Sequence, residues 1–364
     1  MVERTTGISN EFLIHPGETI SDIIIDRGMT QKELAVRTGV SEPFLSDVIN
    51  GKKSISKGLA IGLEYAFGIP SSFWLNLQAN YDAEVIALEE EKSVTESEVE
   101  AFGHLKKIVT YLRKSKAIPA EEKDLHTILN MRRFLGTSNL SNLNKVAMNG
   151  TFRLSSSASV DPYVLGAWLC LCRRPDSECK LEGVFKPECA SELISEIKKI
   201  MCSSSDNPEP VLKALFAKNG IDFSVVQNFP GAPVQGYLER REDGSFRMRL
   251  TIRGSFADIF WFSLFHELGH IVNCDLPKAG VLIDSKDNGK EREDRADCFA
   301  ADTLIDSYDY HMFVRSGHFS YAEICRFSEK QNVPPYIVIG RLQKEGFIPY
   351  SMFSAKKPKY KWYR

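Results

Sequence analysis

The stretch FWFSLFHELGHIV, residues 260–272, places two histidines and a glutamate inside an otherwise apolar run. Buried polar groups cost free energy unless they bind a partner, so this stretch constrains the fold around it. His266 and His270 are four residues apart, and on a helix their side chains lie one turn apart on the same face. Two such imidazoles can bind one metal ion, while Glu267 can take a proton from water as a general base. The spacing is the H-E-x-x-H pattern of a zinc peptidase.

A catalytic zinc site also needs a third protein ligand and an open position. The segment EREDRADCFAAD, residues 291–302, predicts a helix on which Glu293 and Asp297 share one face. We expect Glu293 to be the third ligand and Asp297 to orient a histidine ring by accepting a hydrogen bond from it. Glu291 and Asp294 are rival third ligands on other faces of that helix. These ligand types predict Zn²⁺, and they also accept Mn²⁺ or Fe²⁺.

Composition and cysteine usage describe a protein of the cytoplasm. A hydrophobic content of 43% and a formal net charge of −2 are ordinary for a soluble globular chain and show no overall basicity for a nucleic-acid partner. No secretory signal precedes the eight cysteines, so we expect reduced thiols. The apolar run 256–272 carries charged residues and predicts a buried helix, with no membrane span. A zinc cluster remains an alternative for four cysteines that lack paired CxxC spacing, namely Cys170, Cys172, Cys179 and Cys189.

The first part of the chain reads as short capped helices. Thr30 is a predicted N-cap for QKELAVRTG, which ends at Gly39, and Ser41 is a predicted N-cap for EPFLSDVINGKK. Two capped helices joined by a short turn are typical of a helix-turn-helix. Residues 1–80 hold seven Lys and Arg against nine Asp and Glu. This acidic excess leaves open a helical module for dimerisation or for binding another helix-turn-helix protein, since phosphate contacts need positive charge.

Later segments predict a helical connector and then an α+β region. Residues 84–135 are rich in Glu and Lys with a helical apolar rhythm. Three strand-like runs follow residue 220, namely IDFSVVQNF, VQGYLERR and FRMRLTIRG, and EDGS between the last two predicts a hairpin. The apolar helix with the two histidines comes directly after them.

The hairpin, FWFSLFHELGHIV and EREDRADCFAADTLI resemble the ImmA/IrrE family of zinc metallo-endopeptidases. The resemblance extends to FRLSSSASVDPYVLGAWL before them and PPYIVIGRLQKEGFIPYS after them, and it covers roughly residues 150–355. It implies a zincin-like (gluzincin) fold, zinc ligands His266, His270 and Glu293, and Glu267 as base. Arg295 stands where many members have a second acidic residue. Members of this family cut helix-turn-helix repressors, so the resemblance implies a repressor or antitoxin as substrate.

Residues 15–82 resemble the HigA-like antitoxins of the Cro/C1 helix-turn-helix class, from the HPGE opening to the FWLNLQANYD ending. This resemblance implies binding of a double-stranded DNA operator by a homodimer, with the helix after Ser41 in the major groove. The residues expected nearest the bases are Ser41, Glu42, Pro43, Phe44, Ser46 and Asp47. The expected backbone contacts are Gln31, Asn50, Lys52 and Lys53.

Together these patterns predict a multidomain regulator. An all-α Cro/C1-type helix-turn-helix domain spans residues 10–83, a helical connector spans 84–149, and an α+β metallopeptidase domain with a small antiparallel sheet spans 150–364. We expect a cytoplasmic, zinc-dependent, site-specific endopeptidase that is also a transcriptional regulator. The alternative is an antitoxin-type repressor of a toxin-antitoxin module whose metal site is structural, sensory or latent. A third reading, a toxin neutralised by its own fused antitoxin half, predicts growth arrest by residues 150–364 alone.

Overall fold

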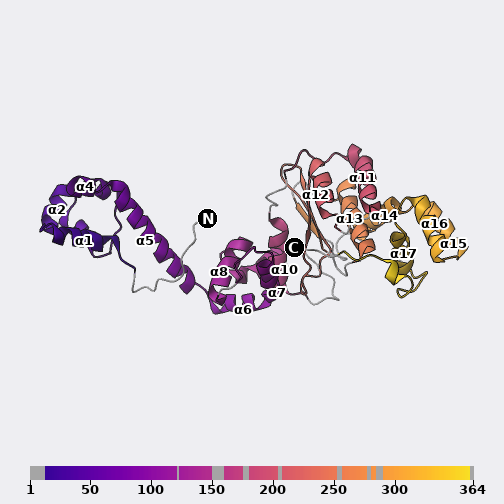
Figure 1. Ribbon diagram of the computed structural model, residues 1–364, viewed down its shortest axis with the longest axis horizontal. Coiled ribbons are helices and arrows are strands. Elements are labelled where there is room, and N and C mark those ends of the chain that lie inside the picture. Colours follow the sequence, from indigo (N-terminus) through magenta and orange to yellow (C-terminus); the bar gives the residue numbers. More distant parts are fainter. Residues whose placement is uncertain are drawn as a thin grey trace. The chain divides into compact units, whose positions relative to one another are not determined.

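The computed structural model describes residues 13–120, 123–149, 160–174, 180–203, 207–251, 256–276, 280–283 and 290–360. The chain forms two compact units, Met1–Thr95 and Glu96–Arg364 (Figure 1). The expected connector, residues 84–149, is therefore divided between them. Its first residues continue a helix of the first unit, and the rest folds as part of the second.

The first unit is all helical. Its helices are α1 (Pro16–Asp26), α2 (Gln31–Thr38), α3 (Glu42–Ile49), α4 (Lys57–Phe67) and α5 (Ser71–Lys92). The predicted N-caps are confirmed, because Thr30 Oγ1 accepts a hydrogen bond from Glu33 N at 3.1 Å and Ser41 Oγ accepts one from Phe44 N at 3.3 Å. Gly39 ends α2 at φ 71°, a left-handed conformation that glycine adopts without strain. Thus α2, the turn and α3 form the expected helix-turn-helix.

The HPGE opening and the FWLNLQANYD ending of this unit pack against each other. His15 caps α1 by accepting a hydrogen bond from Gly17 N at 2.9 Å, and its ring packs edge-on against Tyr81 of α5. Gln78, also on α5, accepts a hydrogen bond from Ile55 N at 2.9 Å. The core between these helices includes Ile20, Leu34, Leu45, Val48, Leu59, Leu63 and Trp74, all fully buried. Both sequence signatures therefore have a structural role.

Gly17 lies where α1 meets the end of α3. A Cβ at this position would overlap the carbonyl oxygen of Val48 and lie 2.5 Å from that of Ile49. We therefore predict that Gly17→Ala destabilises the first unit by about 1–3 kcal/mol, the usual cost of overpacking. Gly58→Ala on α4 is the matched control, because its nearest neighbour would be Ser56 Oγ at 4.0 Å.

Hydrogen exchange of the full chain, followed by mass spectrometry over residues 16–49, measures this effect. Faster exchange is expected in the Gly17 variant and not in the Gly58 variant. Equal protection in both variants would contradict the close contact of α1 with α3.

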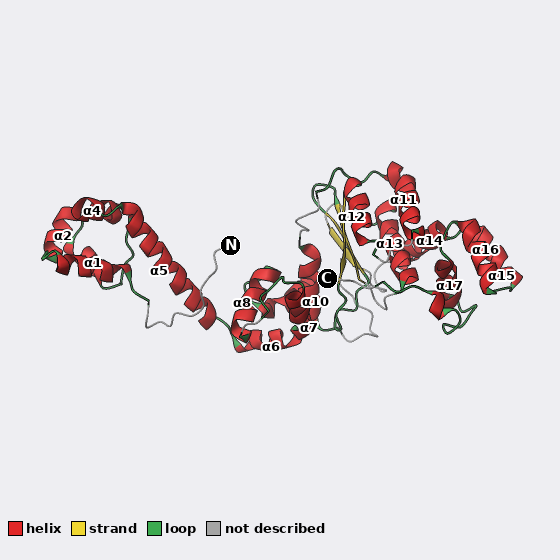
Figure 2. Cartoon of the chain, viewed as in Figure 1, coloured by secondary structure: helices red, strands yellow, loops and turns green. Residues whose placement is uncertain are grey.

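The second unit combines helices with one sheet (Figure 2). The helices before the sheet are α6 (Glu96–His104), α7 (Lys106–Lys114), α8 (Asp124–Leu135), α9 (Leu143–Asn149), α10 (Pro162–Arg173), α11 (Ala190–Cys202) and α12 (Glu209–Lys218). Those after its third strand are α13 (Ala257–Val272), α14 (Lys290–Leu304), α15 (Ser307–Ser316), α16 (Tyr321–Gln331) and α17 (Pro335–Lys344). Among the described residues, no helix is long and apolar enough to cross a membrane.

The sheet contains β1 (Ile221–Val226), β2 (Gly236–Arg240), β3 (Phe246–Thr251) and β4 (Gly280–Ile283), in the order β1-β3-β2-β4. The predicted hairpin is confirmed, since β2 and β3 pair antiparallel. The expectation of a wholly antiparallel sheet is wrong, because β1 pairs with β3 in parallel. The chain leaves β1 through a loop, enters β2 in the opposite direction and returns in β3. As a result, β1 lies on the outer side of β3.

The two faces of the sheet differ in chemistry. Leu238, Met248 and Phe223 belong to one face and pack in the core shared with α12 and α13. The opposite face carries Arg249, only 2% exposed, which donates to Asp222 Oδ2 at 3.0 Å and to the Cys172 carbonyl oxygen of α10 at 3.2 Å. Figure 1 shows α10 on one side of the sheet, and α12 and α13 on the other. Since α13 contacts the apolar face, the sheet supports the helix that carries the two histidines.

Polar contacts connect α6, α8 and α10 in the second unit. Glu98 of α6 is fully buried, pairs with Arg132 of α8 and accepts a hydrogen bond from Leu140 N at 2.9 Å. His104, at the end of α6, binds Asp161 Oδ2 at 2.6 Å, and Asp161 in turn caps α10. These polar contacts join α6 and α8 to α10 and, through α10, to the sheet.

Candidate metal centre

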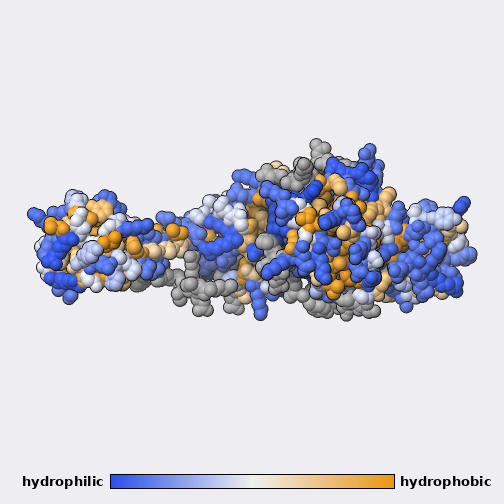
Figure 3. Space-filling view, turned by 90° about the horizontal axis from the view of Figure 1, so that it is seen from above, coloured by the Kyte–Doolittle hydropathy of each residue, from blue (hydrophilic) through white to orange (hydrophobic). Residues whose placement is uncertain are grey.

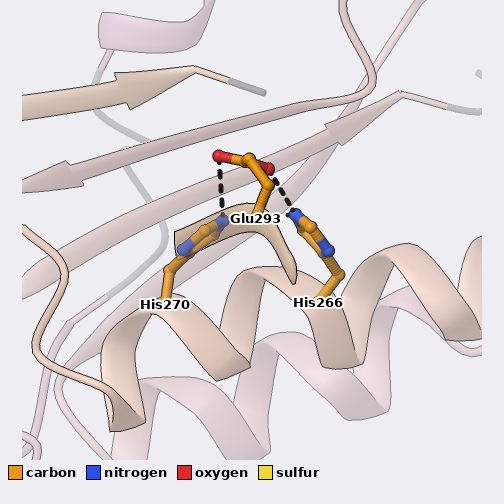
Figure 4. Close-up of side chains that lie close together, drawn as sticks. All are labelled: His266, His270 and Glu293. Carbon is orange, nitrogen blue, oxygen red and sulfur yellow. Dashed lines mark hydrogen bonds and ion pairs between the residues drawn. The ribbon is translucent and has the colours of Figure 1, made fainter. Parts of the chain in front are cut away.

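His266, His270 and Glu293 meet at the contact of α13 with α14. The two Nε2 atoms are 3.2 Å apart, and the Glu293 oxygens lie 3.2 Å from Nε2 of His266 and 3.7 Å from Nε2 of His270. Figure 4 shows both imidazoles projecting from α13 toward the Glu293 carboxylate. Within the described part of the chain, no other group of three or more His, Cys, Asp or Glu side chains is arranged to hold a metal ion.

This donor set fits a zinc ion. A tetrahedral ion with ligands at 2.0–2.1 Å requires donor atoms about 3.3 Å apart. The two Nε2 atoms are 3.2 Å apart, and Glu293 Oε2 is 3.2 Å from Nε2 of His266, while the other carboxylate oxygen is 3.7 Å from Nε2 of His270. Two neutral nitrogens and one carboxylate oxygen form a mixed N/O set, which zinc accepts. Three protein ligands also leave one of four positions open.

Each histidine ring contacts a carboxylate through its Nδ1 atom, on the side away from Glu293. Asp297 Oδ1 lies 2.9 Å from Nδ1 of His266, and Asp275 Oδ2 lies 2.9 Å from Nδ1 of His270. A proton on each Nδ1 leaves the Nε2 lone pair free for a metal. Asp297 has the position expected from its spacing to Glu293. Asp275 was not predicted; Cys274, at φ 57°, turns the chain back so that Asp275 reaches the ring five residues before it.

Arg295 has a defined place in this arrangement. Its Nη2 donates to Asp275 Oδ1 at 2.6 Å, while the other carboxylate oxygen of Asp275 binds His270. The Arg295 side chain is 57% exposed and that of Asp275 is 1% exposed. The residue that departs from the family pattern thus supplies the buried aspartate with a cationic partner.

Glu267 lies against the start of strand β2. Its side chain is buried, with 2% of the residue exposed, and a Cβ at Gly236 would overlap its Oε1 atom. A larger residue at position 236 would therefore displace this carboxylate from its present position. The role of Gly236 was not anticipated either, because it depends on where β2 crosses α13. The charge of the Glu267 carboxylate also acts to raise the pKa of His270, so Glu267 belongs to the surroundings of the histidine pair.

The charges of the centre support one another. Burial acts to raise the pKa of Glu293, but hydrogen bonds with His266 and His270 outweigh it and lower that pKa to about 2. Burial acts to lower the pKa of His270, yet its contacts with Glu293, Glu267 and Asp275 raise it overall. Carboxylate charge is thus held in the centre at neutral pH, as binding of a cation requires.

Other candidate ligands lie elsewhere. Glu291 and Asp294 are exposed and do not belong to the ligand cluster. Cys170, Cys172 and Cys189 are free thiols outside any described metal-binding group, and Cys179 lies outside the described residues.

Tyr310, His311 and Arg341 follow α14 in the chain and carry groups that could stabilise an oxyanion, but they have other partners. Tyr310 is buried and binds Glu345 Oε2 at 3.0 Å, while the Arg341 guanidinium lies 3.8 Å from the centre of the Tyr310 ring. His311 binds the Ser307 carbonyl oxygen at 2.6 Å. Neither Tyr310, Arg341 nor His311 is part of the described ligand cluster.

The structure also places the expected DNA contacts. Exposed residues at the start of α3, in the loop after it and at the start of α2 are Ser41, Glu42, Pro43, Asn50, Lys52, Lys53 and Gln31. Phe44, Ser46 and Asp47 are half-buried. Lys53 binds Asp47 Oδ2 at 2.9 Å, and Asn50 donates to the Ser46 carbonyl oxygen at 2.7 Å. The Lys53 ammonium holds the pKa of Asp47 below its usual value, so part of the positive charge of this surface offsets Asp47.

Comparison with known proteins identifies the first unit. Residues 20–74 match the family model described as Helix-turn-helix, HTH_3. Virulence-associated protein A′ of Dichelobacter nodosus is 41% identical over 69 residues, which are 19% of this chain and 60% of that protein. Virulence-associated protein A of the same organism is 36% identical over 69 residues, 18% of this chain and 68% of that protein. Through its N-terminal unit the chain belongs to the helix-turn-helix family.

Among solved structures, the chain is similar to the antitoxin HigA of Pseudomonas aeruginosa determined with the higBA promoter. The identity is 31%, the TM-score is 0.21, and the match covers 22% of this chain and 87% of HigA. The chain spans about 60% of the length of the first curated relative. His266, His270 and Glu293 lie outside the residues that the family model matches.

The pKa of Glu293 tests the geometry of the centre without a metal. In a His266→Ala/His270→Ala variant, burial remains and the two hydrogen bonds are lost, so we expect the Glu293 pKa to rise from about 2 to above its usual 4.5. Carboxyl ¹³C NMR titration in the presence of a chelator measures it. His311→Ala, which changes an exposed histidine, is the control. A Glu293 pKa that stays near 2 in the double variant would contradict the proximity of the imidazoles.

Proposed function

We propose that the chain is a fused regulator that binds operator DNA through its first unit and hydrolyses a peptide bond through its second. The observation that carries the peptidase proposal is the position of Glu267, buried beside three side chains whose spacing suits a zinc ion. A structural metal site needs ligands but has no use for a base. The presence of this fourth group therefore favours chemistry.

The mechanism assigns a separate task to each residue. His266, His270 and Glu293 would hold Zn²⁺, with Mn²⁺ or Fe²⁺ as other occupants. When bound, the metal supplies Lewis acidity toward the scissile carbonyl and the attacking water. Glu267 accepts the proton of that water and passes it to the leaving amine. Asp297 and Asp275 keep the two imidazoles oriented through their Nδ1 atoms.

For the substrate we propose a repressor or antitoxin protein. The resemblance of the second unit to the ImmA/IrrE family supports this choice, because members of that family act on helix-turn-helix repressors. The first unit also supports this choice of substrate, since a chain that binds operator DNA and cleaves a repressor would regulate transcription in both ways. Cleavage and operator binding would then act on one set of genes.

The first experiment measures metal content per chain, together with cleavage of repressors encoded beside the gene, for the unaltered protein and for Glu267→Gln. Because Glu267 is not a ligand in this proposal, we expect one equivalent of zinc in both proteins. Cleavage is expected only with the unaltered protein, and mutation of a general base lowers the rate roughly 10²–10⁴-fold.

Two controls sharpen this experiment. Glu293→Gln should lose both metal and cleavage, whereas Glu291→Gln, an exposed neighbour on α14, should lose neither. Full activity of the Glu267 variant, or absence of metal from the unaltered protein, would refute the peptidase proposal.

Operator binding is the part of the proposal that the comparisons support most directly. The family match covers α2, the turn and α3, and HigA, a similar protein, was determined with promoter DNA. The α3 surface presents Ser41, Glu42 and Pro43 to solvent. Because Lys53 offsets Asp47, Lys52 is the cation of this surface best placed for a DNA phosphate.

We further propose that the DNA-binding form is a homodimer. Large apolar side chains remain exposed on α4 and α5, with Ile61 at 49%, Tyr65 at 83% and Phe73 at 45%. On the visible face of the first unit, Figure 3 shows hydrophobic patches among hydrophilic ones. Burial of such side chains against a second copy would remove apolar surface from water. A dimer also suits a palindromic operator.

Replacing Lys52 tests the DNA contact. We expect Lys52→Gln to weaken binding to operator and to unrelated DNA alike, and to reduce the slope of log K against log salt by about 1, since one phosphate contact is lost. Lys92→Gln, at the far end of α5, is the matched control. Fluorescence anisotropy over a salt series gives the slopes. An unchanged slope in the Lys52 variant would remove this residue from the interface.

The second candidate function is that of an antitoxin-type repressor whose metal site is structural, sensory or latent. The similarity to HigA, named an antitoxin, favours this candidate. It predicts bound metal and operator binding without cleavage by either the unaltered protein or Glu267→Gln.

A further inference from the structure

A cavity of about 510 Å³ lies in the second unit between α7 and the segment that follows β1. Its volume falls within the range of roughly 300–1,000 Å³ that small-molecule sites occupy. None of its lining residues belongs to the ligand cluster of the metal centre. The lining consists of Lys107, Thr110, Tyr111, Lys114, Ser115 and residues 225–230.

One wall of the cavity is the polar face of α7. Lys107, Thr110, Tyr111 and Lys114 follow the i, i+3, i+4, i+7 spacing of a single helix face. The opposite face of α7 is buried and consists of Ile108, Val109 and Leu112. The helix therefore packs through its apolar face and presents two ammonium groups to the cavity.

The charge of this wall is not neutralised by the described residues. No acidic side chain is among the described lining residues, and neither Lys107 nor Lys114 forms an ion pair with a described residue. A concave surface of one sign concentrates counter-ions of the other. The cavity is thus suited to an anion.

The opposite wall adds apolar and amide groups. Phe229 is buried and its ring packs edge-on against Tyr111, with ring centres 5.6 Å apart. Asn228 Nδ2 is buried and has no hydrogen-bond partner among the described residues. A buried donor without an acceptor costs free energy, which a ligand or a water molecule can relieve. A molecule with both an anionic and an apolar part fits these walls.

We propose that this cavity binds a small organic molecule that carries a phosphate group. The Lys107 and Lys114 ammonium groups bind the phosphate by charge-assisted hydrogen bonds. The apolar part of the ligand contacts the pair of rings formed by Tyr111 and Phe229. This binding site does not depend on the peptidase activity proposed above.

The sheet connects the cavity with Glu267. Val225 of β1 pairs with Leu250 of β3, which pairs with Gly236 of β2. The cavity wall and Gly236 therefore lie at the same end of the sheet, two strands apart, about 10 Å by the usual strand spacing. Residues 227–235 run from the cavity to Gly236, against which Glu267 packs. A ligand that orders this segment also restricts the position of the base; this second step rests on the proposed function.

Isothermal titration calorimetry of the full chain tests the site, with ADP and inorganic phosphate as probes. We expect ADP to bind, and Lys107→Gln/Lys114→Gln to weaken that binding at least tenfold. Lys106→Gln, an exposed lysine of α7 outside the lining, should change it less than twofold. If inorganic phosphate binds as tightly as ADP, the phosphate group alone is recognised. If ADP binds more tightly, the apolar wall also contributes to the affinity. Absence of binding by both probes at millimolar concentration, or unchanged binding by the double variant, would overturn the site.

Hydrogen exchange with and without ADP tests the connection to Glu267. Slower exchange is expected over residues 225–240 in the unaltered protein and no change in the double variant. ADP binding without protection of residues 234–240 would overturn the connection. Neither measurement requires peptide cleavage, so failure here leaves the proposed peptidase intact, and failure of the peptidase leaves the binding site intact.

Discussion

The contact between α13 and α14 is the constraint on which the candidate centre depends. Gly269 permits it, because a Cβ there would lie 3.3 Å from the Cα of Ala296 and 3.0 Å from the Phe299 ring. On α14, Glu293 precedes Ala296 by about one turn, and on α13 the two histidines flank Gly269. The close approach of Gly269 to Ala296 therefore brings the Glu293 carboxylate near the two histidines. A larger residue at position 269 would move α14 outward and with it the third ligand. The glycine of the H-E-L-G-H stretch thus sets the distance between the two helices that hold the ligands.

The sheet contributes to the centre through its two unlike faces. Its apolar face packs against α13. Its polar face carries the Arg249–Asp222 pair between β3 and β1, and Arg249 also donates to the Cys172 carbonyl oxygen of α10. Breaking a buried ion pair by removing one partner is costly, since the remaining charge has no water to solvate it. The pair therefore holds β1 against β3 and keeps the strands in register behind the helix. Gly236 at the start of β2 then lies so close to Glu267 that a Cβ there would displace the Glu267 carboxylate.

Local geometry explains which features the sequence alone could predict. The caps at Thr30 and Ser41, the left-handed Gly39 and the i, i+4 histidines all depend on residues within one or two helical turns, so spacing predicts them. Asp275 and Gly236 reach the centre only through a reversal at Cys274 and the crossing of a strand over α13, which spacing does not encode. The parallel pairing of β1 with β3 was not predicted for the same reason. Strand β4 was not predicted either, because it is only four residues long.

Charge placement distinguishes the two units and bears on how one chain could serve two partners. Around α3 the Lys53–Asp47 pair and the exposed Glu42 leave little net positive charge. The operator binding proposed above would therefore depend more on base contacts than on phosphate contacts. In the second unit, carboxylates surround the histidine pair and favour a cation, while the α7 cavity is lined by cations and favours an anion. Under the two proposals above, these opposite charge preferences would let a metal ion and a phosphate-bearing ligand bind to one unit without competing.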